Sequence, residues 1–354
     1  MIRTLGQRMA VRLPFSVQQR QQVIYWLVLL IPLPLAIYAI GLGRYPIAPG
    51  DVIDALVRFV VDPPDAAAAP DLVYNVVTRI RLPRIAASLL IGANLAVTGV
   101  AFQGIFRNPL VDSNILGVTS GAGFGAALML LISASAGLVQ ASAFGFGLLA
   151  VFLAYGISRL YYSAPLLVLT LVGILIGSFF GSLTSILKYI ADPLDSLPAI
   201  TYWLMGSLTD VTLSDIPVLA AISVAGLVFM WTVRWRLNVL SLGDHEAQAL
   251  GLNPTRLKLT IILFSTLMTS VAVSVGGVIG WVGLVIPHAA RTLVGPDHQR
   301  LIPATMALGA SFLLVIDTLS RTLWSTEVPL GVFTGVVGVP LLLAILRFNK
   351  TGWK

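Results

Sequence analysis

The chain has 354 residues, of which 57% are hydrophobic and only 10% are charged. Soluble domains carry about 25% charged residues, so the composition excludes a soluble globular protein. The absence of cysteine excludes disulfides and thiolate metal sites. The net charge of +7 lies in short segments between apolar runs, which is typical of membrane topology and not of nucleic-acid binding.

Ten apolar stretches predict membrane-spanning helices, because a bilayer core of about 30 Å needs about 20 apolar residues per helix. They cover residues 23–42, 84–105, 114–133, 137–157, 166–188, 214–233, 259–276, 279–294, 301–320 and 330–347. The sequence therefore predicts an all-α polytopic protein with one transmembrane domain over 23–347, an N-terminal tail over 1–22 and a C-terminal tail over 348–354.

The Lys and Arg residues predict the orientation of these spans. With the N-terminus inside, 15 of the 22 fall on the cytoplasmic side, as the positive-inside rule requires. This bias predicts that both termini are cytoplasmic. The long segment 43–83, with a short amphipathic helix near 51–60, then lies outside, and the segment 234–258 lies inside.

Three arginines mark the outer ends of two spans. Arg81 and Arg84 precede the second span, and Arg321 ends the ninth, four residues after Asp317. An arginine at the bilayer centre costs about 2.5–3.5 kcal/mol, so these side chains should lie at the water boundary. Interfacial snorkelling, or an Asp317–Arg321 pair on one helix face, would account for them without a functional role.

The inner segment 234–258 contains a short amphipathic pattern over residues 242–252. Acidic residues suit its first turn, apolar residues form one face, and a glycine can end it. A helix this short is marginal alone, so we expect a partner surface for its residues: Leu242, Gly243, Asp244, Glu246, Ala247, Leu250 and Gly251.

Signatures of catalysis are missing from the sequence. No G-x-x-x-x-G-K-[ST] motif for nucleotide phosphates occurs. The three histidines His245, His288 and His298 lack metal-ligand spacing. We therefore predict a non-enzymatic chain with no catalytic, cofactor or metal site of its own.

Several segments, taken in order, resemble the FecCD-type permease family of ABC importers for iron-siderophores, haem and cobalamin. The resemblance rests on Arg81-Leu-Pro-Arg84, Gly92-Ala-Asn-Leu-Ala96, Arg107-Asn-Pro-Leu110, Ile115-Leu-Gly-Val-Thr-Ser-Gly-Ala122, Trp203-Leu-Met-Gly-Ser-Leu208, Gly283-Leu-Val-Ile-Pro-His288 and Pro329-Leu-Gly331.

The resemblance implies a type II ABC importer permease fold with about ten helices in the bacterial cytoplasmic (inner) membrane. It implies pairing with a second copy or a paralogous permease. Two ATP-binding subunits would dock below and use the ATP, and a periplasmic or lipid-anchored binding protein would deliver substrate to the outer side, where segment 43–83 is a periplasmic loop.

The resemblance also assigns roles to residues of this sequence. Arg81, Arg84 and Arg321 would dock the binding protein, and the 242–252 segment would couple to the ATPase. The cytoplasmic gate would include Asn108 and Leu110, together with Ser163 and Ala164 before the fifth span. Val111 and Asp112 depart from the alanine that often follows the family's Asn-Pro-Leu turn.

The sequence constrains the identity of the substrate less than it constrains the family. A pathway lined by small and hydroxyl residues, among them Ser178, Ser182 and Thr184, suits bulky cargo. Within the family a ferric siderophore is favoured, while haem, cobalamin and oxyanions such as molybdate remain open. An ion-coupled secondary transporter is the alternative from another class, but the spans hold few of the ionisable groups that such coupling needs.

Overall fold

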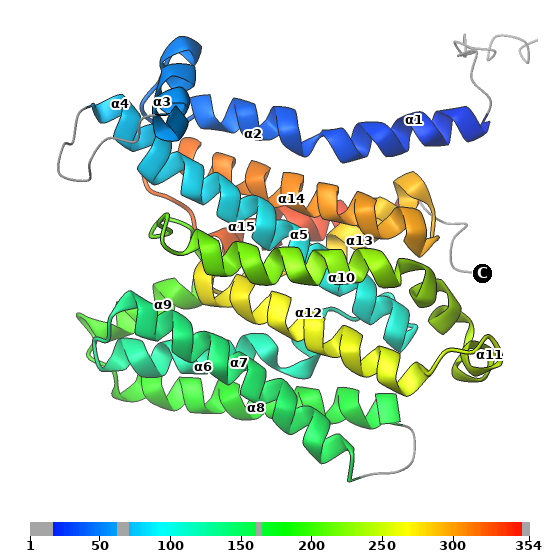
Figure 1. Cartoon of the computed structure of the whole chain (residues 1–354). Helices are drawn as coiled ribbons and strands as arrows, with labels where there is room; N and C mark the ends of the chain where they lie inside the picture. The colour runs from blue at the N-terminus through cyan, green and yellow to red at the C-terminus, as the bar shows by residue number, and fades with distance from the viewer. Residues whose placement is uncertain (1–16, 62–70, 161–164, 349–354) are drawn as a thin grey trace, which may run out of the picture.

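The computed structural model describes residues 17–61, 71–160 and 165–348, and every regular element in these ranges is a helix. Most of the helices run side by side along one axis (Figure 1). The all-α prediction is therefore confirmed. Within these ranges, eight helical stretches are long and apolar enough to cross a bilayer: Gln21–Gly41, Leu72–Phe106, Ala136–Ser158, Leu166–Ile190, Ile216–Leu242, Pro254–Gly276, His298–Thr322 and Leu330–Arg347.

These stretches correspond to labelled helices. The first combines α1 (Val17–Leu30) and α2 (Pro32–Gly41), and the second combines α4 (Leu72–Asn75), a π-helical turn η1 (Val76–Arg81) and α5 (Leu82–Phe106). The others are α7 (Ala136–Ser158), α8 (Pro165–Ile190), α10 (Ile216–Leu242), α12 (Pro254–Gly276), α14 (His298–Thr322) and α15 (Leu330–Phe348).

Two of the ten predicted spans are shorter than expected. In place of 114–133 lies α6 (Val118–Leu131), preceded by the 3-10 turn η2 (Ser113–Leu116), and in place of 279–294 lies α13 (Val282–Val294). At 1.5 Å per residue each covers only about 20 Å. Left-handed residues interrupt both starts, namely Gly117 (φ 81°) and Trp281 (φ 69°). The ten predicted spans are thus eight full-length helices and two short ones.

Helix α5 lies at the centre of the bundle, and 83% of its apolar window is buried against other helices. Glycines permit this close packing. A Cβ added at Gly92 would overlap the carbonyl of Gly309 on α14, and one at Gly99 would overlap the carbonyl of Gly283 on α13. Small residues at such crossings let helix backbones approach closely in membranes.

The start of the second span differs from the prediction. Its helix begins at Leu72, so Pro83 lies within a continuous helix instead of at its first turn. Proline lacks an N–H and crowds the carbonyl four residues earlier. The wider π turn directly before it, closed by the Leu82 N–H donating to the Val77 carbonyl, accommodates the proline.

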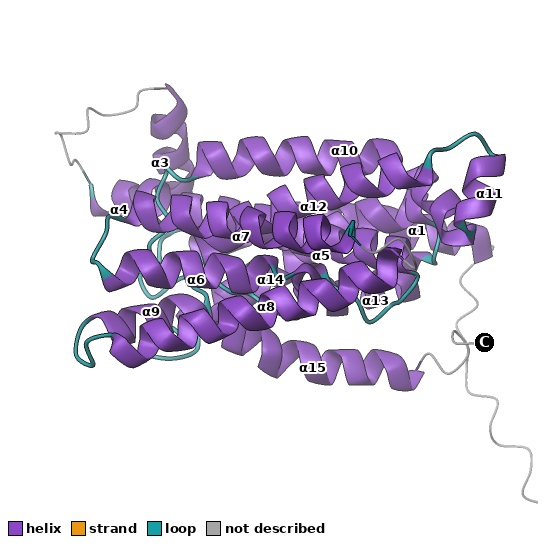
Figure 2. Cartoon of the chain, turned by 90° about the horizontal axis from the view of Figure 1, so that it is seen from below, coloured by secondary structure: helices purple, strands orange, loops and turns teal. Residues whose placement is uncertain are grey.

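Short helices cover the two ends of the bundle. At one end α3 (Pro49–Val61) lies across the bundle axis, close to α4, and α9 (Ser196–Met205) lies at the same end, next to α6 (Figure 1). The opposite end carries α11 (Asp244–Ala249), as Figure 2 also shows. We call these the α3 end and the α11 end. Helix α3 matches the predicted amphipathic helix, whereas α9 was not predicted.

The predicted inner segment 234–258 is mostly helical. Residues up to Leu242 continue α10, and α12 begins at Pro254. The link between the two long helices is therefore only the segment 243–253, which contains α11.

Candidate functional site

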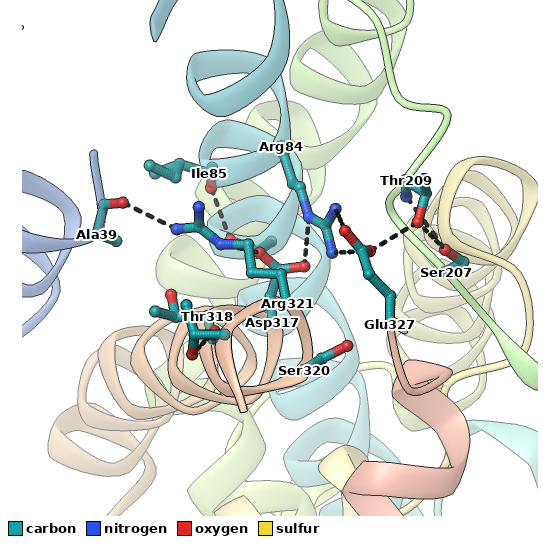
Figure 3. Close-up of polar contacts among 12 residues, drawn as sticks. Ala39, Arg84, Ile85, Ser207, Thr209, Asp317, Thr318, Ser320, Arg321 and Glu327 are labelled. Atoms are coloured by element: carbon teal, nitrogen blue, oxygen red, sulfur yellow. Dashed lines mark hydrogen bonds and ion pairs between the residues drawn. The ribbon is translucent and has the colours of Figure 1, made fainter. Parts of the chain in front are cut away.

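The α3 end holds a buried ion-pair cluster that joins α5 to α14. Arg84 Nε donates to Asp317 Oδ1 at 2.7 Å, and its Nη2 lies 2.8 Å from Glu327 Oε2 (Figure 3). Thr209 Oγ1 donates to the same Glu327 oxygen at 2.9 Å. Asp317 is completely buried, so the carboxylate and the guanidinium compensate each other where water is absent.

Arg321 completes this cluster and extends it to the first span. Its Nε lies 3.8 Å from Asp317 Oδ2, so the predicted pairing of these two residues on α14 is present. Its other nitrogens donate to backbone carbonyls at the end of α2, namely Ala39 at 2.8 Å and Leu42 at 2.7 Å.

Arg81 binds the same helix end through other carbonyls. Its Nη1 donates to the carbonyls of Ile40 at 2.6 Å and Gly41 at 3.0 Å, and its Nη2 donates to that of Tyr45. Carbonyls at a helix C-terminus have no partners within the helix, and cations there interact favourably with the helix dipole. Arg81 and Arg321 therefore fix the first span to the bundle.

These arginines lie at the predicted end of the bundle, but their side chains are not open to water. Arg81, Arg84 and Arg321 lie at the end of the bundle, as expected, but are only 4%, 6% and 7% exposed. The guanidinium groups bind carboxylates and carbonyls of the chain itself, because each meets an acceptor on a neighbouring element. Docking through them, as the resemblance implied, would require an external carboxylate to displace or join these internal partners.

Glu327 is the member of the cluster that sequence reasoning missed as a site residue. It lies in the link between α14 and α15 and is one-quarter exposed. Burial raises the pKa of its carboxyl, but the hydrogen bond and charge of Arg84, with the hydroxyl of Thr209, outweigh burial and lower the pKa below its ordinary value. Glu327 is thus held ionised on Arg84.

At the α11 end, the predicted coupling segment presents apolar side chains to the outside. Leu242 is 66% exposed and Leu250 is 57% exposed, while Ala247 is buried beneath them. Gly243 has a φ of 152° that favours glycine, and the Glu246 carboxylate occupies the space where a Cβ at Gly243 would stand. Exposed leucines on both sides of a six-residue helix, Leu242 at the end of α10 and Leu250 directly after α11, are typical of a surface that another protein covers.

Asp244 connects this segment to two long helices. Both of its carboxylate oxygens accept from Lys258 Nζ of α12, at 2.6 and 2.7 Å. Its Oδ1 also accepts from Arg107 Nη2, directly after α5, at 2.9 Å. The sequence indicated Asp244 as a residue of the first helical turn, but neither partner was predicted, because they lie 137 and 14 residues away.

The predicted gate turn lies beside this connection. Asn108 Oδ1 accepts from the Leu110 N–H at 3.0 Å, so the amide side chain closes a local turn. Leu110 is 63% exposed at the α11 end. The other two gate candidates, Ser163 and Ala164, lie outside the described residues.

The exposed side of helix α8 carries a row of small and hydroxyl residues beside large apolar ones such as Leu175 and Phe179. Ser178, Gly181, Ser182 and Ser185 are exposed, and Ser182 and Ser185 donate to carbonyls of their own helix. Thr184, which the sequence suggested as a pathway residue, is 8% exposed and faces the interior. Only part of the predicted lining is therefore accessible.

A metal-binding group of three or more His, Cys, Asp or Glu side chains is not found among residues 17–61, 71–160 and 165–348. The buried histidines have local partners instead. His288 Nδ1 lies 2.7 Å from the Leu284 carbonyl, and His298 Nδ1 lies 2.8 Å from Asn238 Oδ1.

Comparisons with known proteins agree with this architecture. The molybdate import system permease MolB of Haemophilus influenzae is 37% identical, over 94% of this chain and 97% of its own length. The cobalamin import permease BtuC of Halobacterium salinarum is 37% identical (78% and 75% covered), and the iron(3+)-hydroxamate import permease FhuB of Bacillus subtilis is 34% identical (79% and 73% covered).

A solved structure of a metal-chelate type ABC transporter in an inward-facing conformation superposes with a TM-score of 0.82 at 34% identity. The match covers 92% of this chain and 99% of that one. The model of the FecCD transport family matches residues 28–348. The chain therefore belongs to the FecCD transport family, as a membrane-spanning permease of a type II ABC importer.

Proposed function

We propose that this permease pairs with a second copy to import a ferric siderophore, and that two ATPase subunits docked at the α11 end drive the transport. The observation that carries the proposal is the exposed apolar surface of Leu242 and Leu250 around α11. The chain lacks a nucleotide-binding motif, so energy must reach it through such a surface. ATP binding can shift a conformational equilibrium only through contacts that differ between the two states.

The α11 end is the cytoplasmic end in this proposal. Most of the positive charges in the connecting segments lie on that side, in agreement with the positive-inside rule. The α3 end then faces the periplasm and receives the binding protein.

The exposed hydroxyl face of α8 supports pairing and a shared pathway. Only 22% of the apolar window of α8 is buried within the subunit. The serines and Gly181 of α8 offer small, uncharged side chains that would make few strong contacts with cargo, as release from a pathway requires. Two permease copies that pair with their α8 helices facing one another would enclose a pathway between them.

Because the arginines predicted to dock the binding protein are buried, the proposed docking site includes other arginines that are exposed. Arg84 and its neighbours are buried on internal partners, whereas Arg44 and Arg79 are exposed at the α3 end, where Arg44 also donates to the carbonyls of Arg321 and Trp324. These two reach an approaching acidic surface first and would steer it. The buried arginines would then hold the surface that the binding protein meets.

A ferric siderophore is proposed as the cargo because a hydroxamate permease is among the relatives. Molybdate is the second candidate, because the molybdate permease relative matches nearly the whole chain, 94% of it. The binding protein sets the choice between them, since the pathway offers few specific contacts.

Reconstitution tests this proposal directly. Proteoliposomes containing the permease, its ATPase and its binding protein should accumulate a labelled ferric hydroxamate in an ATP-dependent manner, and molybdate should not compete. Uptake of molybdate alone would transfer the function to the second candidate. Uptake driven by an ion gradient without the ATPase would overturn the proposal.

A further inference from the structure

The Asp244 cluster contains two ion pairs with different surroundings. The Lys258 side chain is only 10% exposed, whereas those of Arg107 and Asp244 are 43% and 46% exposed. A buried ammonium cannot lose its carboxylate without a large desolvation cost. An exposed ion pair contributes little and exchanges readily with water. The Lys258 pair is therefore a fixed anchor, while the Arg107 pair can open and close.

Arg107 has an unusual backbone for its residue type. It ends α5 in the left-handed conformation, with a φ of 50°. Non-glycine residues seldom adopt this region, and the surroundings must hold them there. Its side chain reaches Asp244, and its backbone leads directly into the Asn108–Leu110 turn. The Arg107–Asp244 ion pair is thus one contact that holds the Asn108–Leu110 turn in its observed shape.

Space around Asp244 permits movement. Two clefts, of about 600 and 490 Å³, are both lined by Asp244 and by Leu166 of α8. The first also contains Arg107 and the second contains Lys258. Open volume therefore lies beside each of the two ion pairs of Asp244.

We propose that Asp244 is the positioning residue that passes movement of α11 to the gate turn, with Lys258 as the pivot and Arg107 as the contact that makes and breaks. This inference rests on the proposed function, because it requires that an ATPase moves α11. Movement of α11 about the Lys258 pair changes the Asp244–Arg107 separation. Loss of that pair releases Arg107 from its left-handed conformation and frees residues 108–110 to change shape.

The test uses the full permease–ATPase complex with a cysteine reporter. The chain has no native cysteine, so Leu110→Cys gives one labelling site in each permease copy once the ATPase cysteines are replaced. The rate of maleimide labelling is measured with and without ATP, beside the rate of ATP hydrolysis. We expect ATP to change the labelling rate several-fold in the reference complex.

Three further variants distinguish this relay, the passage of movement from α11 through Asp244 and Arg107 to the gate turn, from simple structural damage. Arg107→Met should abolish the ATP-dependent change in labelling while ATP hydrolysis continues, and Arg107→Lys should restore part of it. Arg256→Met removes an exposed cation of α12 two residues from Lys258, and should leave the ATP response unchanged. A purely structural role for Arg107 would lower complex yield and hydrolysis together, leaving the ATP response of the surviving complex intact.

Two results would overturn the relay. One is an undiminished ATP response in Arg107→Met, and the other is an equal loss in Arg256→Met. Failure of the ATPase to bind the reference permease at all would instead overturn the proposed function. The two proposals therefore fail in different measurements.

Discussion

Arg84 and Asp317 form an ion pair of 2.7 Å between α5 and α14, and the carboxylate has no exposed surface. Removing one partner of a buried pair leaves an uncompensated charge, which costs about 3–5 kcal/mol. We therefore expect Asp317→Asn to lower the free energy of unfolding by that amount, measured by thermal unfolding in detergent.

The matched control for this substitution is Asp54→Asn. Asp54 pairs with Arg58 on α3 at 2.7 Å, but both side chains are more than half exposed. Such pairs contribute below about 1 kcal/mol, so the control should retain the wild-type Tm. Equal Tm shifts for the two variants would show that the buried pair contributes no special stability.

Glu327, at the α3 end, makes the stability of the protein depend on pH. Its pKa is lowered in the folded protein, from an ordinary value of 4.5, by Arg84 and Thr209 acting against burial. A carboxyl with a depressed folded-state pKa stabilises the protein above the unfolded pKa. That contribution is lost as pH falls below 4.5 and through the folded pKa.

Comparison of the wild type with Glu327→Gln isolates this effect. At neutral pH the variant should have the lower Tm, and the difference should shrink as the pH falls below 4.5 and vanish below the lowered pKa of the folded state. A difference in Tm that stays constant from neutral to acidic pH would exclude an ionised Glu327 as its cause.

The spans were predictable from sequence because lipid demands about 20 apolar residues for each full crossing. That rule counts composition and does not detect backbone interruptions. Gly117 and Trp281 adopt left-handed conformations within apolar stretches, so α6 and α13 begin later than hydropathy alone indicates. The π turn before Pro83 was equally invisible, since it depends on how one proline is accommodated.

The functional ends were partly predictable. Sequence order placed Arg81 and Arg321 at one end, and Asp244 at the other, but it did not reveal their partners. Arg321 meets the carbonyl of Leu42 across 279 residues, and such pairings follow only from the packed fold. Exposure is likewise a tertiary property, which is why the arginines predicted at the water boundary are buried.

The glycines that flank α11 differ in their tolerance of a side chain. Gly243 has φ 152° and ψ 161°, and a Cβ there would overlap the Glu246 carboxylate. Backbone in this region costs other residues about 1–3 kcal/mol. Gly251 also has a positive φ of 78°, but open space surrounds its Cβ position.

We therefore expect Gly243→Ala to distort the start of α11 and to reduce ATPase binding to the permease. Gly251→Ala should reduce it less, because the alanine meets only backbone strain of about 1 kcal/mol. Copurification of the ATPase and its hydrolysis rate provide the measurement. The reverse ranking would mean that the end of the segment, and not its start, forms the contact.

Substitution of the exposed arginines and of the buried arginines at the α3 end should have different effects on docking of the binding protein. Arg44→Glu combined with Arg79→Glu should slow association of the binding protein, most strongly at low salt, because exposed charges chiefly set the encounter rate. The Tm should fall only slightly, because Arg44 loses two hydrogen bonds of 3.3 Å at an exposed position. Arg81→Glu with Arg84→Glu should instead lower the Tm, since both side chains hold the bundle together.

Surface binding kinetics and thermal unfolding, measured on the same preparations, distinguish these effects. Loss of association in the Arg81 and Arg84 double variant with an unchanged Tm would assign docking directly to the buried pair. It would also mean that these arginines turn outward when the partner arrives.

The gate turn can be tested by cross-linking between paired permease copies. The chain contains no cysteine, so Asn108→Cys and Leu110→Cys each introduce one thiol per copy at the α11 end. A disulfide forms only where the Cα atoms approach to about 4.4–6.8 Å. Residues that close a shared pathway should meet this distance in one nucleotide state and not in another.

Leu110→Cys is the cleaner of the two positions, because it keeps the Asn108 side chain that holds the turn. Arg256→Cys, exposed at the same end of the bundle, controls for random collisions and should cross-link weakly in every state. Nucleotide-dependent cross-linking at residues 108 and 110 would place them at the pathway axis. If neither position cross-links above the Arg256→Cys level in any state, the turn does not close the pathway, and the gate must lie elsewhere along the subunit interface.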